Sequence, residues 1–193
     1  MLSLYDWFMK PLESMGIKKA RTILIKRASG DVLELGAGTG ANLIHYDFNQ
    51  VKSLVVTDRT RSKHLKLMED KVSFVQADAT ALPFPNQQFD TVVHTLVFCS
   101  VDDVDAGLQE IKRVLKQDGR LIFIEHVLPH KKGMRRLFQW INPVWRKVSQ
   151  GCSLTKDFGS SLARHGFAIE RQGRFLNTVF FYGIATVQDA KTT

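Results

Sequence analysis

The sequence predicts an α/β fold in which a mostly parallel β-sheet carries helices on both faces. Short apolar runs recur at roughly 20-residue intervals from Val32 onward, with helix-like or loop segments between them. The runs are almost continuously apolar, which is typical of parallel strands buried on both faces. Strands that alternate with helices in this way form a parallel sheet covered by helices.

Five of these runs are expected to be strands. They occupy residues 32–35, 53–56, 72–75, 91–97 and 120–125. Two later runs, residues 167–173 and 178–186, are joined by the short connection 174–177 and are interpreted as an antiparallel hairpin.

Helical spacing predicts helices around these strands. Residues 3–27 are expected to be helical, with a break or kink at Pro11. The apolar positions 104, 108, 111 and 115 share one helix face, and Gly119 is expected to end that helix as a C-terminal cap. A shorter helix is expected over residues 154–165, closed by Gly166.

Length and composition are those of one soluble domain. The chain has 193 residues, 44% of them hydrophobic and 24% charged. We expect a single domain over residues 1–193, with 1–28 as an N-terminal helical cap and 130–155 as a basic, lid-like insertion. No apolar run is long enough to span a membrane and no signal peptide is evident, so a cytoplasmic protein is expected, with peripheral membrane contact left open. The two cysteines, Cys99 and Cys152, provide neither a disulfide framework nor metal-ligand spacing.

The positive charge of the chain is concentrated in two flanking segments. The formal net charge is +8, but residues 31–130 carry 10 basic and 14 acidic side chains. Residues 131–174 carry 10 basic and 2 acidic side chains, and residues 1–30 carry 6 and 2. Such flanks favour an anionic partner or surface.

A glycine-rich loop follows the first expected strand. The stretch from Asp31 to Asn42 contains Gly36, Gly38 and Gly40, and it is expected to open a helix. Glycine permits a tight turn and lets a ligand lie against main-chain N–H groups. Alone, this spacing also satisfies the dinucleotide-binding fingerprint, and a turn without a ligand is the alternative.

Three carboxylates distinguish the possible ligands. Asp58 ends the second strand, where it could accept both ribose hydroxyls of an adenosine. Asp78 ends the third strand, where it could accept a hydrogen bond from an adenine amino group, which a dehydrogenase does not need. Glu34 lies just under the loop, where it would be unfavourable beside a pyrophosphate and favourable beside an ammonium or sulfonium. The structural alternative for Asp58 and Asp78 is helix N-capping.

These motifs, in this order, resemble the class I S-adenosylmethionine-dependent methyltransferases. Within that family the chain is most similar to small thiol- and phospholipid-type methyltransferase-like proteins, on residues 93–101, 123–127 and 151–155. The resemblance covers about residues 28–127 and rests on the segments 34–40, 58, 78–79, 82–84, 89–93 and 115–121.

The resemblance implies a Rossmann-like, seven-stranded, mostly parallel sheet whose final hairpin inserts one antiparallel strand. It also implies S-adenosyl-L-methionine as the cofactor and S-adenosyl-L-homocysteine as the product. The glycine loop would face the methionine part, Asp58 the ribose, and Thr95 and Leu96 the sulfonium. The cofactor-binding residues implied in this way are Tyr5, Gly36, Ala37, Gly38, Gly40, Asn42, Asp58, Arg59, Asp78, Ala79, Thr95 and Leu96.

The acceptor is expected to be small and apolar or amphiphilic, most plausibly a thiol. A thiolate is the nucleophile, and a free thiol ionises only at about pH 8.5, so a nearby base would help. Glu125 and His126, at the end of the fifth strand, are the candidates for accepting a proton or orienting the acceptor, with His94 behind them. A phospholipid- or quinone-type N-, C- or O-acceptor is the alternative, and no metal is required. Acceptor-facing residues are expected within 94–100, 125–128, 131–155 and the N-terminal helix.

Other function classes stay open at this stage. The basic segment 131–147 could be a lid, could lie on an acidic membrane, or could be a solvated helix face. Nucleic-acid methylation is disfavoured, because Thr95-Leu96-Val97-Phe98 stands where an Asn/Asp-Pro-Pro-aromatic motif would be needed. A nicotinamide oxidoreductase and a non-catalytic cofactor-binding module are the remaining alternatives, and the oligomeric state is not predicted.

Overall fold

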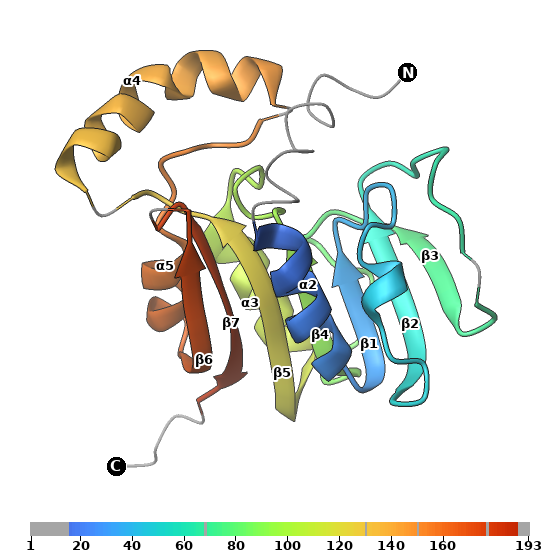
Figure 1. Ribbon diagram of the computed structural model, residues 1–193. Helices are drawn as coiled ribbons and strands as arrows, with labels where there is room; N and C mark the ends of the chain where they lie inside the picture. The colour runs from blue at the N-terminus through green and yellow to red at the C-terminus, as the bar shows by residue number, and fades with distance from the viewer. Residues whose placement is uncertain (1–15, 68, 130, 150, 177, 189–193) are drawn as a thin grey trace, which may run out of the picture.

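The computed structural model describes residues 16–67, 69–129, 131–149, 151–176 and 178–188. Tyr5, Pro11 and the greater part of the expected N-terminal helix lie outside these residues. One sheet of seven strands organises the described chain, in the order β3-β2-β1-β4-β5-β7-β6 (Figure 1). The strands are β1 (Gly30–Leu35), β2 (Val51–Asp58), β3 (Val72–Gln76), β4 (Phe89–Thr95), β5 (Leu115–His126), β6 (Phe167–Phe175) and β7 (Phe180–Val187).

The first five strands are parallel, as their continuous apolar character predicted. β1 pairs with β2 on one side and with β4 on the other, so Leu35 lies between Thr57 and His94. The order of the strands therefore reverses between β1 and β4. Ligands of open α/β sheets bind at such a reversal, outside the carboxyl ends of the strands.

The C-terminal hairpin is confirmed. β7 pairs antiparallel with both β5 and β6, so it is the one antiparallel strand of the sheet. The expected strands 167–173 and 178–186 correspond to β6 and β7 within two residues at each end.

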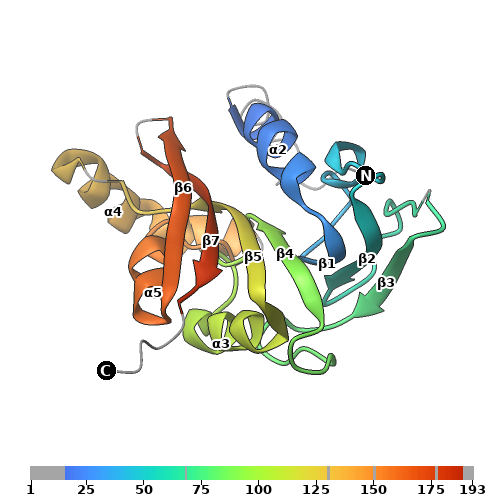
Figure 2. The same cartoon turned by 90° about the horizontal axis from the view of Figure 1, so that it is seen from below.

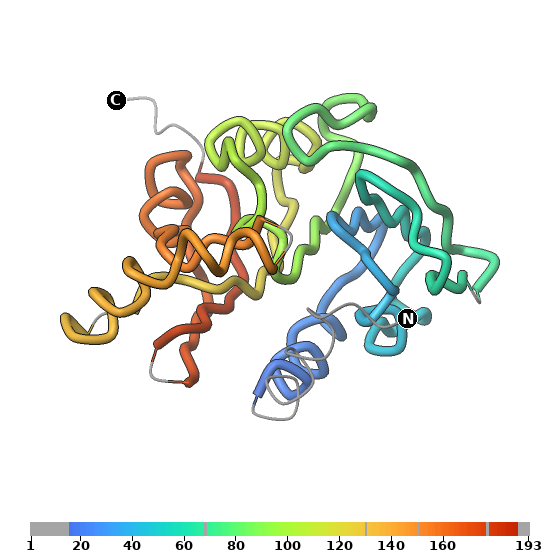
Figure 3. Tube along the Cα trace, turned by 90° about the horizontal axis from the view of Figure 1, so that it is seen from above, coloured from blue at the N-terminus to red at the C-terminus, as the bar shows by residue number. Residues whose placement is uncertain are grey.

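Helices cover both faces of the sheet, as predicted. On one face, α2 (Lys18–Leu24) and the short 3₁₀ helices η2 (Ile25–Arg27) and η3 (Leu43–His45) pack through Leu24, Ile25 and Tyr46. On the other, α3 (Val104–Val114) and α5 (Phe158–Arg164) pack through Leu108 and Phe158. Figure 2 shows α2 on one side of the sheet and α3 and α5 on the opposite side. The remaining helix, α4 (Lys132–Val148), lies across the carboxyl ends of the strands instead (Figures 1 and 3).

Two expected helix boundaries are wrong. α3 ends at Val114, and Gly119 lies inside β5 instead of capping the helix. Leu115 pairs with Phe89 and Arg120 pairs with Thr91, so residues 116–119 form an irregularity within the strand pair. α5 begins at Phe158 and not near 154, because the Asp157 side chain accepts the N–H of Ser160 and caps the helix there.

The glycine loop does not open an α-helix. Only the three-residue 3₁₀ helix η3 follows it, and its N-cap residue, Asn42, makes no side-chain cap. The amide of Asn42 instead enters a buried network under the loop.

Candidate functional site

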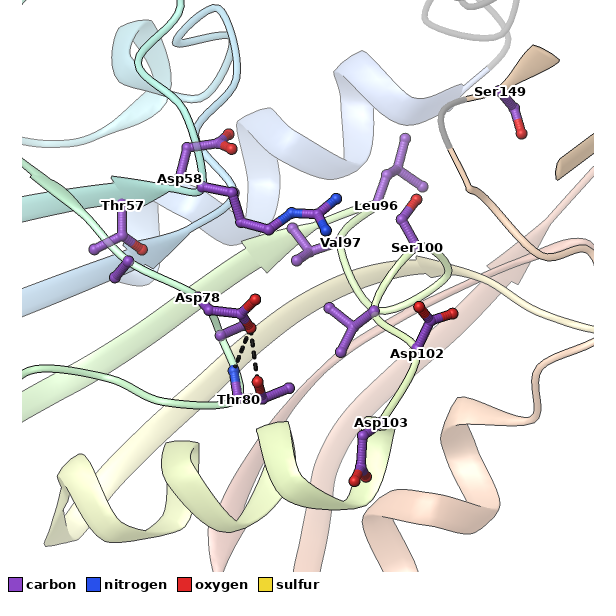
Figure 4. A pocket seen from close by; sticks show the side chains of 15 residues that line it. Thr57, Asp58, Asp78, Thr80, Leu96, Val97, Ser100, Asp102, Asp103 and Ser149 are labelled. Carbon is purple, nitrogen blue, oxygen red and sulfur yellow. Dashed lines mark hydrogen bonds between the residues drawn. The ribbon is translucent and has the colours of Figure 1, made fainter. Parts of the chain in front are cut away.

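A cavity of about 370 Å³ opens at the reversal of the strand order. Its walls come from the loop after β1, the ends of β2 and β3, the turn after β4, the start of α3, and the residue that follows α4. In Figure 4, Asp58 and Asp78 project from neighbouring strands on one side of the cavity, with Ser100 and Asp102 of the segment after β4 on the other. The lining residues are Gly36, Thr57, Asp58, Arg59, Ala77, Asp78, Ala79, Thr80, Leu96, Val97, Ser100, Val101, Asp102, Asp103 and Ser149.

The backbone of the glycine loop requires glycine at the cavity wall. Gly36 has a φ of +65°, and an added Cβ there would collide with the Val97 side chain. The turn is closed by N–H bonds from Ala37 to the Thr57 carbonyl (2.9 Å) and from Gly40 to the Ala37 carbonyl (2.8 Å). Gly38 has a φ of +54° with open space around its Cβ position. The loop therefore presents bare backbone toward solvent and the cavity.

Asp58 and Asp78 do not cap helices, so that alternative reading is wrong for both. A carboxylate oxygen of Asp58 accepts the N–H of Gly38 at 2.9 Å, which ties the end of β2 to the glycine loop. One oxygen of Asp78 accepts both the N–H (2.9 Å) and the hydroxyl (2.8 Å) of Thr80. These hydrogen bonds lower the pKa of Asp78, the backbone bond most, so its carboxylate stays charged at neutral pH.

A buried polar network lies under the glycine loop, centred on Glu34. The Tyr46 hydroxyl donates to one oxygen of Glu34 at 2.7 Å, and the Asn42 amide donates to the other at 3.0 Å. The Arg21 guanidinium of α2 donates to the Asn42 carbonyl oxygen, and the Asn42 amide also reaches the Thr95 hydroxyl (3.2 Å). Burial raises the pKa of Glu34 to about 7, although the bonds from Tyr46 and Asn42 oppose the shift. The network links α2, the loop and the end of β4.

Glu125 forms a second buried network with the turn after β4. One of its oxygens lies 2.8 Å from Nδ1 of His94 and accepts the N–H groups of Val97 (2.9 Å) and Phe98 (3.0 Å). The other accepts the N–H of Cys99 at 3.2 Å. Glu125 is 0% exposed. Glu125 thus fixes the turn that carries the cavity residues Leu96 and Val97, and Leu96 itself has a φ of +58°.

His126 lies under α4 and does not line the cavity. Its ring stacks on Phe138 of α4 at 5.9 Å and meets Phe180 edge-on at 5.6 Å. Burial lowers the pKa of His126 to about 4, so the imidazole is neutral at physiological pH. Its Nδ1 is buried and has no hydrogen-bond partner among the described residues.

Half of the predicted cofactor residues line the cavity: Gly36, Asp58, Arg59, Asp78, Ala79 and Leu96. Ala37, Gly38 and Gly40 shape the loop beside it, and Asn42 and Thr95 belong to the buried network. Several lining residues were missed, among them Thr57, Thr80, Asp103 and Ser149. Asp103 could have been found as the N-cap of α3, because its side chain accepts the N–H of Ala106.

The two cysteines lie in the part of the chain that the structure describes, and they contact one another. Cys99 and Cys152 are both buried, and a hydrogen bond between their thiols raises the pKa of Cys99. Within the described ranges, no group of three or more His, Cys, Asp or Glu side chains is arranged to hold a metal ion.

Comparison with known proteins gives concordant results. The profile of the methyltransferase domain family matches residues 33–123. The thiol S-methyltransferase TMT1B of Rattus norvegicus is 31% identical over 157 residues, which cover 75% of this chain and 63% of that protein. The ubiquinone/menaquinone biosynthesis C-methyltransferase UbiE of Shewanella frigidimarina is 34% identical over 173 residues, covering 81% and 67%. The chain thus spans about two thirds of the length of these relatives.

The fold of the chain is also similar to that of a solved structure. The S-adenosylmethionine-dependent methyltransferase of Mesorhizobium loti superposes with a TM-score of 0.68 at 15% identity, covering 89% of this chain and 97% of that one.

Proposed function

The chain belongs to the S-adenosylmethionine-dependent methyltransferases, and we propose that it transfers a methyl group from S-adenosylmethionine to a small apolar or amphiphilic acceptor, with a thiol as the first candidate. The observation that carries this proposal is the cavity at the strand reversal, where Asp58 and Asp78 line the same side and the glycine loop presents bare backbone. Two carboxylates spaced along one wall suit the two hydroxyls of a ribose and the amino edge of an adenine.

The cofactor would lie along the carboxyl edge of the sheet. In this arrangement the loop of Gly36 to Gly40 holds the methionine part, Asp58 the ribose hydroxyls, and Arg59, Asp78 and Ala79 the adenine. Leu96 borders the sulfonium end, while Asn42 and Thr95 support the loop from below through the Glu34 network. Tyr5 lies outside the described residues, and its part in binding the cofactor stays a prediction.

One feature of the loop argues against a nicotinamide enzyme. Dinucleotide-binding folds seat a pyrophosphate on the N-terminus of the helix that follows the glycine loop. Here only the three-residue η3 follows, so no helix dipole is available for a pyrophosphate. The buried carboxyl of Glu34 under the loop favours a cationic ligand instead.

The protein mainly has to align the acceptor and exclude water, because the bound cofactor supplies an activated methyl group on its sulfonium. With a thiol acceptor, S-adenosylmethionine would supply the methyl group and leave as S-adenosylhomocysteine, and the thiol proton would pass to solvent water. We assign His126 to orient the acceptor, because its neutral imidazole can accept a hydrogen bond through the unpartnered Nδ1. Glu125 is assigned to positioning, because its oxygens accept the N–H groups of Val97, Phe98 and Cys99 and thereby hold the turn after β4.

The surroundings of His126 favour an apolar or amphiphilic acceptor. Phe138 stacks on its ring and Phe180 meets the ring edge-on, so the surroundings of the imidazole are aromatic. A thiol fits this environment, and the similarity to a thiol S-methyltransferase supports it. The alternative is a quinone- or phospholipid-type acceptor, which the similarity to a ubiquinone/menaquinone C-methyltransferase supports.

Replacing Asp58 with alanine should weaken S-adenosylmethionine binding by about 1.5–3 kcal/mol, roughly 10- to 150-fold, through the loss of charge-assisted hydrogen bonds to the ribose. Asp58→Asn keeps an acceptor for the Gly38 N–H and should lose less affinity. Asp118→Ala, which removes an exposed carboxylate outside the cavity, is the control. Calorimetric titration measures all three, and unchanged affinity in Asp58→Ala would remove Asp58 from the site.

Replacing His126 with alanine should lower turnover at least 10-fold, a modest effect for a group that orients or deprotonates a substrate, while cofactor affinity stays at the wild-type value. His126→Gln keeps a hydrogen-bonding group and should recover part of the turnover if the role is orientation. Because the pKa of His126 is about 4, its protonation should not lower the rate between pH 6 and 8. Equal turnover of wild type and His126→Ala with a competent thiol would contradict the assignment.

Two other functions give distinct outcomes. A nucleic-acid methyltransferase should bind RNA with a steep dependence on salt. A non-catalytic binding module should bind S-adenosylmethionine and release no S-adenosylhomocysteine with any acceptor.

The partner that the basic segment favours is an anionic membrane surface, which the protein would contact peripherally. Among the described residues, no helix is long and apolar enough to cross a bilayer.

A further inference from the structure

The helix α4 is amphipathic but buries none of its residues fully. Every other α-helix of the described chain has fully buried side chains. Met134, Phe138, Ile141 and Trp145 are half-buried and form the stripe of α4 that faces the protein. A second apolar stripe lies beside it and is exposed, with Trp140 at 80%. The exposed stripe consists of Leu137, Trp140, Val144 and Val148.

The spacing of the exposed stripe shows that it is one continuous face. Its members follow one another by three, four and four residues, which keeps them on one side of an α-helix. Together the two stripes give α4 an apolar face much wider than the protein covers. Isolated exposed apolar residues need no explanation, but a contiguous row that includes a tryptophan marks an interaction surface.

The charge on α4 identifies the partner. Lys131, immediately before the helix, is followed by Lys132, Arg135, Arg136, Arg146 and Lys147, and all six are exposed. No acidic residue occurs from 131 to 156. By helical spacing, Lys132, Arg135 and Arg146 lie opposite the apolar stripes, and Arg136 and Lys147 border the exposed stripe next to Trp140. A helix with lysine and arginine on one face and tryptophan and leucine on the other lies in the plane of a lipid interface. A second copy of α4 would instead bring like charges together.

The attachment of α4 to the rest of the domain is compatible with contact between its exposed stripe and a lipid surface. The Asn142 side chain accepts the N–H of Leu154 at 2.7 Å, and Arg146 pairs with Asp102 at 3.0 Å. The helix is thereby attached to the domain at its C-terminal half. Figures 1 and 3 show it lying across the carboxyl ends of the strands, on the outside of the molecule.

We propose that α4 docks the protein onto an anionic lipid surface, with the stripe Leu137–Trp140–Val144–Val148 entering the interface and the flanking cations contacting acidic headgroups. The inner face of α4 contacts His126, and the next residue after the helix, Ser149, lines the cofactor cavity. Given the proposed methyltransferase function, on which this part rests, docking would place the acceptor side of the site against the bilayer and admit amphiphilic acceptors from it.

Vesicle sedimentation tests the docking directly on the full chain. Wild type should bind vesicles of phosphatidylcholine with phosphatidylglycerol, should bind pure phosphatidylcholine vesicles at least 10-fold more weakly, and should be released by high salt. The double variant Trp140→Glu/Val144→Glu should lose at least 10-fold in binding to the anionic vesicles. Arg135→Glu/Arg136→Glu should lose a similar factor.

Matched variants separate α4 from general surface effects. Ile44→Glu introduces one such negative charge at an exposed apolar residue outside α4, and Lys26→Glu/Arg27→Glu reverses two adjacent exposed cations at the opposite edge of the sheet. Both should bind vesicles as the wild type does. Binding by the α4 variants equal to wild type, or failure of wild type to bind anionic vesicles at low salt, would overturn the proposal.

Two further measurements on the same samples keep the outcomes distinct. Sedimentation velocity would reveal a wild-type dimer that Trp140→Glu/Val144→Glu converts to a monomer, which would make the stripe a contact between copies and also overturn the proposal. S-adenosylmethionine titration should give wild-type affinity in every variant. Failure of cofactor binding in all of them, with vesicle binding intact, would contradict the methyltransferase function and leave the docking in place.

Discussion

Replacing Glu125 with alanine should lower the free energy of unfolding by about 3–5 kcal/mol, because it leaves several buried hydrogen-bonding groups without a partner at about 1–3 kcal/mol each. The carboxylate is completely buried and accepts three backbone N–H groups besides contacting His94. Removing it leaves those donors without a partner in a site that water does not reach. Urea denaturation measures the change. Because the same bonds fix the turn of Leu96 and Val97, cofactor affinity should fall as well.

The control for Glu125 is an exposed carboxylate that takes part in a surface ion pair. Asp102 pairs with Arg146, and its side chain is 89% exposed. Asp102→Ala should change the free energy of unfolding by less than about 1 kcal/mol, as exposed ion pairs do. Glu125→Gln keeps the shape but gives up one acceptor, so it should be intermediate. A loss below about 1 kcal/mol in Glu125→Ala would show that the network does not stabilise the fold.

The free energy of unfolding of the wild type should fall as the pH rises from 4.5 to 7. Replacing Glu34 with glutamine should remove this fall. Burial raises the pKa of Glu34 from 4.5 to about 7, so the folded state holds a proton that the unfolded state has released. The free energy of unfolding therefore decreases as the pH rises through this window, by about 3 kcal/mol in total. Glutamine does not titrate, so the difference between wild type and Glu34→Gln isolates this contribution.

Glu110 provides a control of opposite sign. Its hydrogen bond with Arg113 lowers the pKa of Glu110. The stability that it contributes is present above pH 4.5 and is lost as the pH falls below that value. The difference in the free energy of unfolding between wild type and Glu110→Gln should thus rise with pH, which is the opposite of the change expected for Glu34. A wild-type minus Glu34→Gln difference that is flat from pH 4.5 to 7 would show that the surrounding donors keep Glu34 ionised.

The central strands β1, β4 and β5 were predictable from the sequence because each contains an apolar run that the fold buries on both faces. The run 72–75 became β3 (Val72–Gln76), and the C-terminal hairpin was found from its two runs and the short connection between them. Local sequence patterns gave wrong boundaries where the same residues fit both a helix and a strand. Leu115 fits both the apolar spacing of α3 and a strand, and the glycine at 119 suggested a helix end where the chain forms an irregular strand pair.

The site residues that lie at the ends of strands were predictable from the sequence. The site residues whose position depends on tertiary contacts were not. Gly36, Asp58 and Asp78 sit at strand ends, so their meeting at one edge of a parallel sheet follows from the order of the elements. The burial of Glu125 depends on the turn of residues 97–99 folding back onto β5, which no pattern indicates. Ser149 reaches the cavity only because the chain returns to it after α4.

The central claim is that the cavity at the strand reversal binds S-adenosylmethionine. Calorimetric titration of the full chain with S-adenosylmethionine, S-adenosylhomocysteine and NADH tests it most directly. The account predicts binding of the first two with micromolar dissociation constants and no binding of NADH. Binding of NADH alone, or of none of the three, would contradict it.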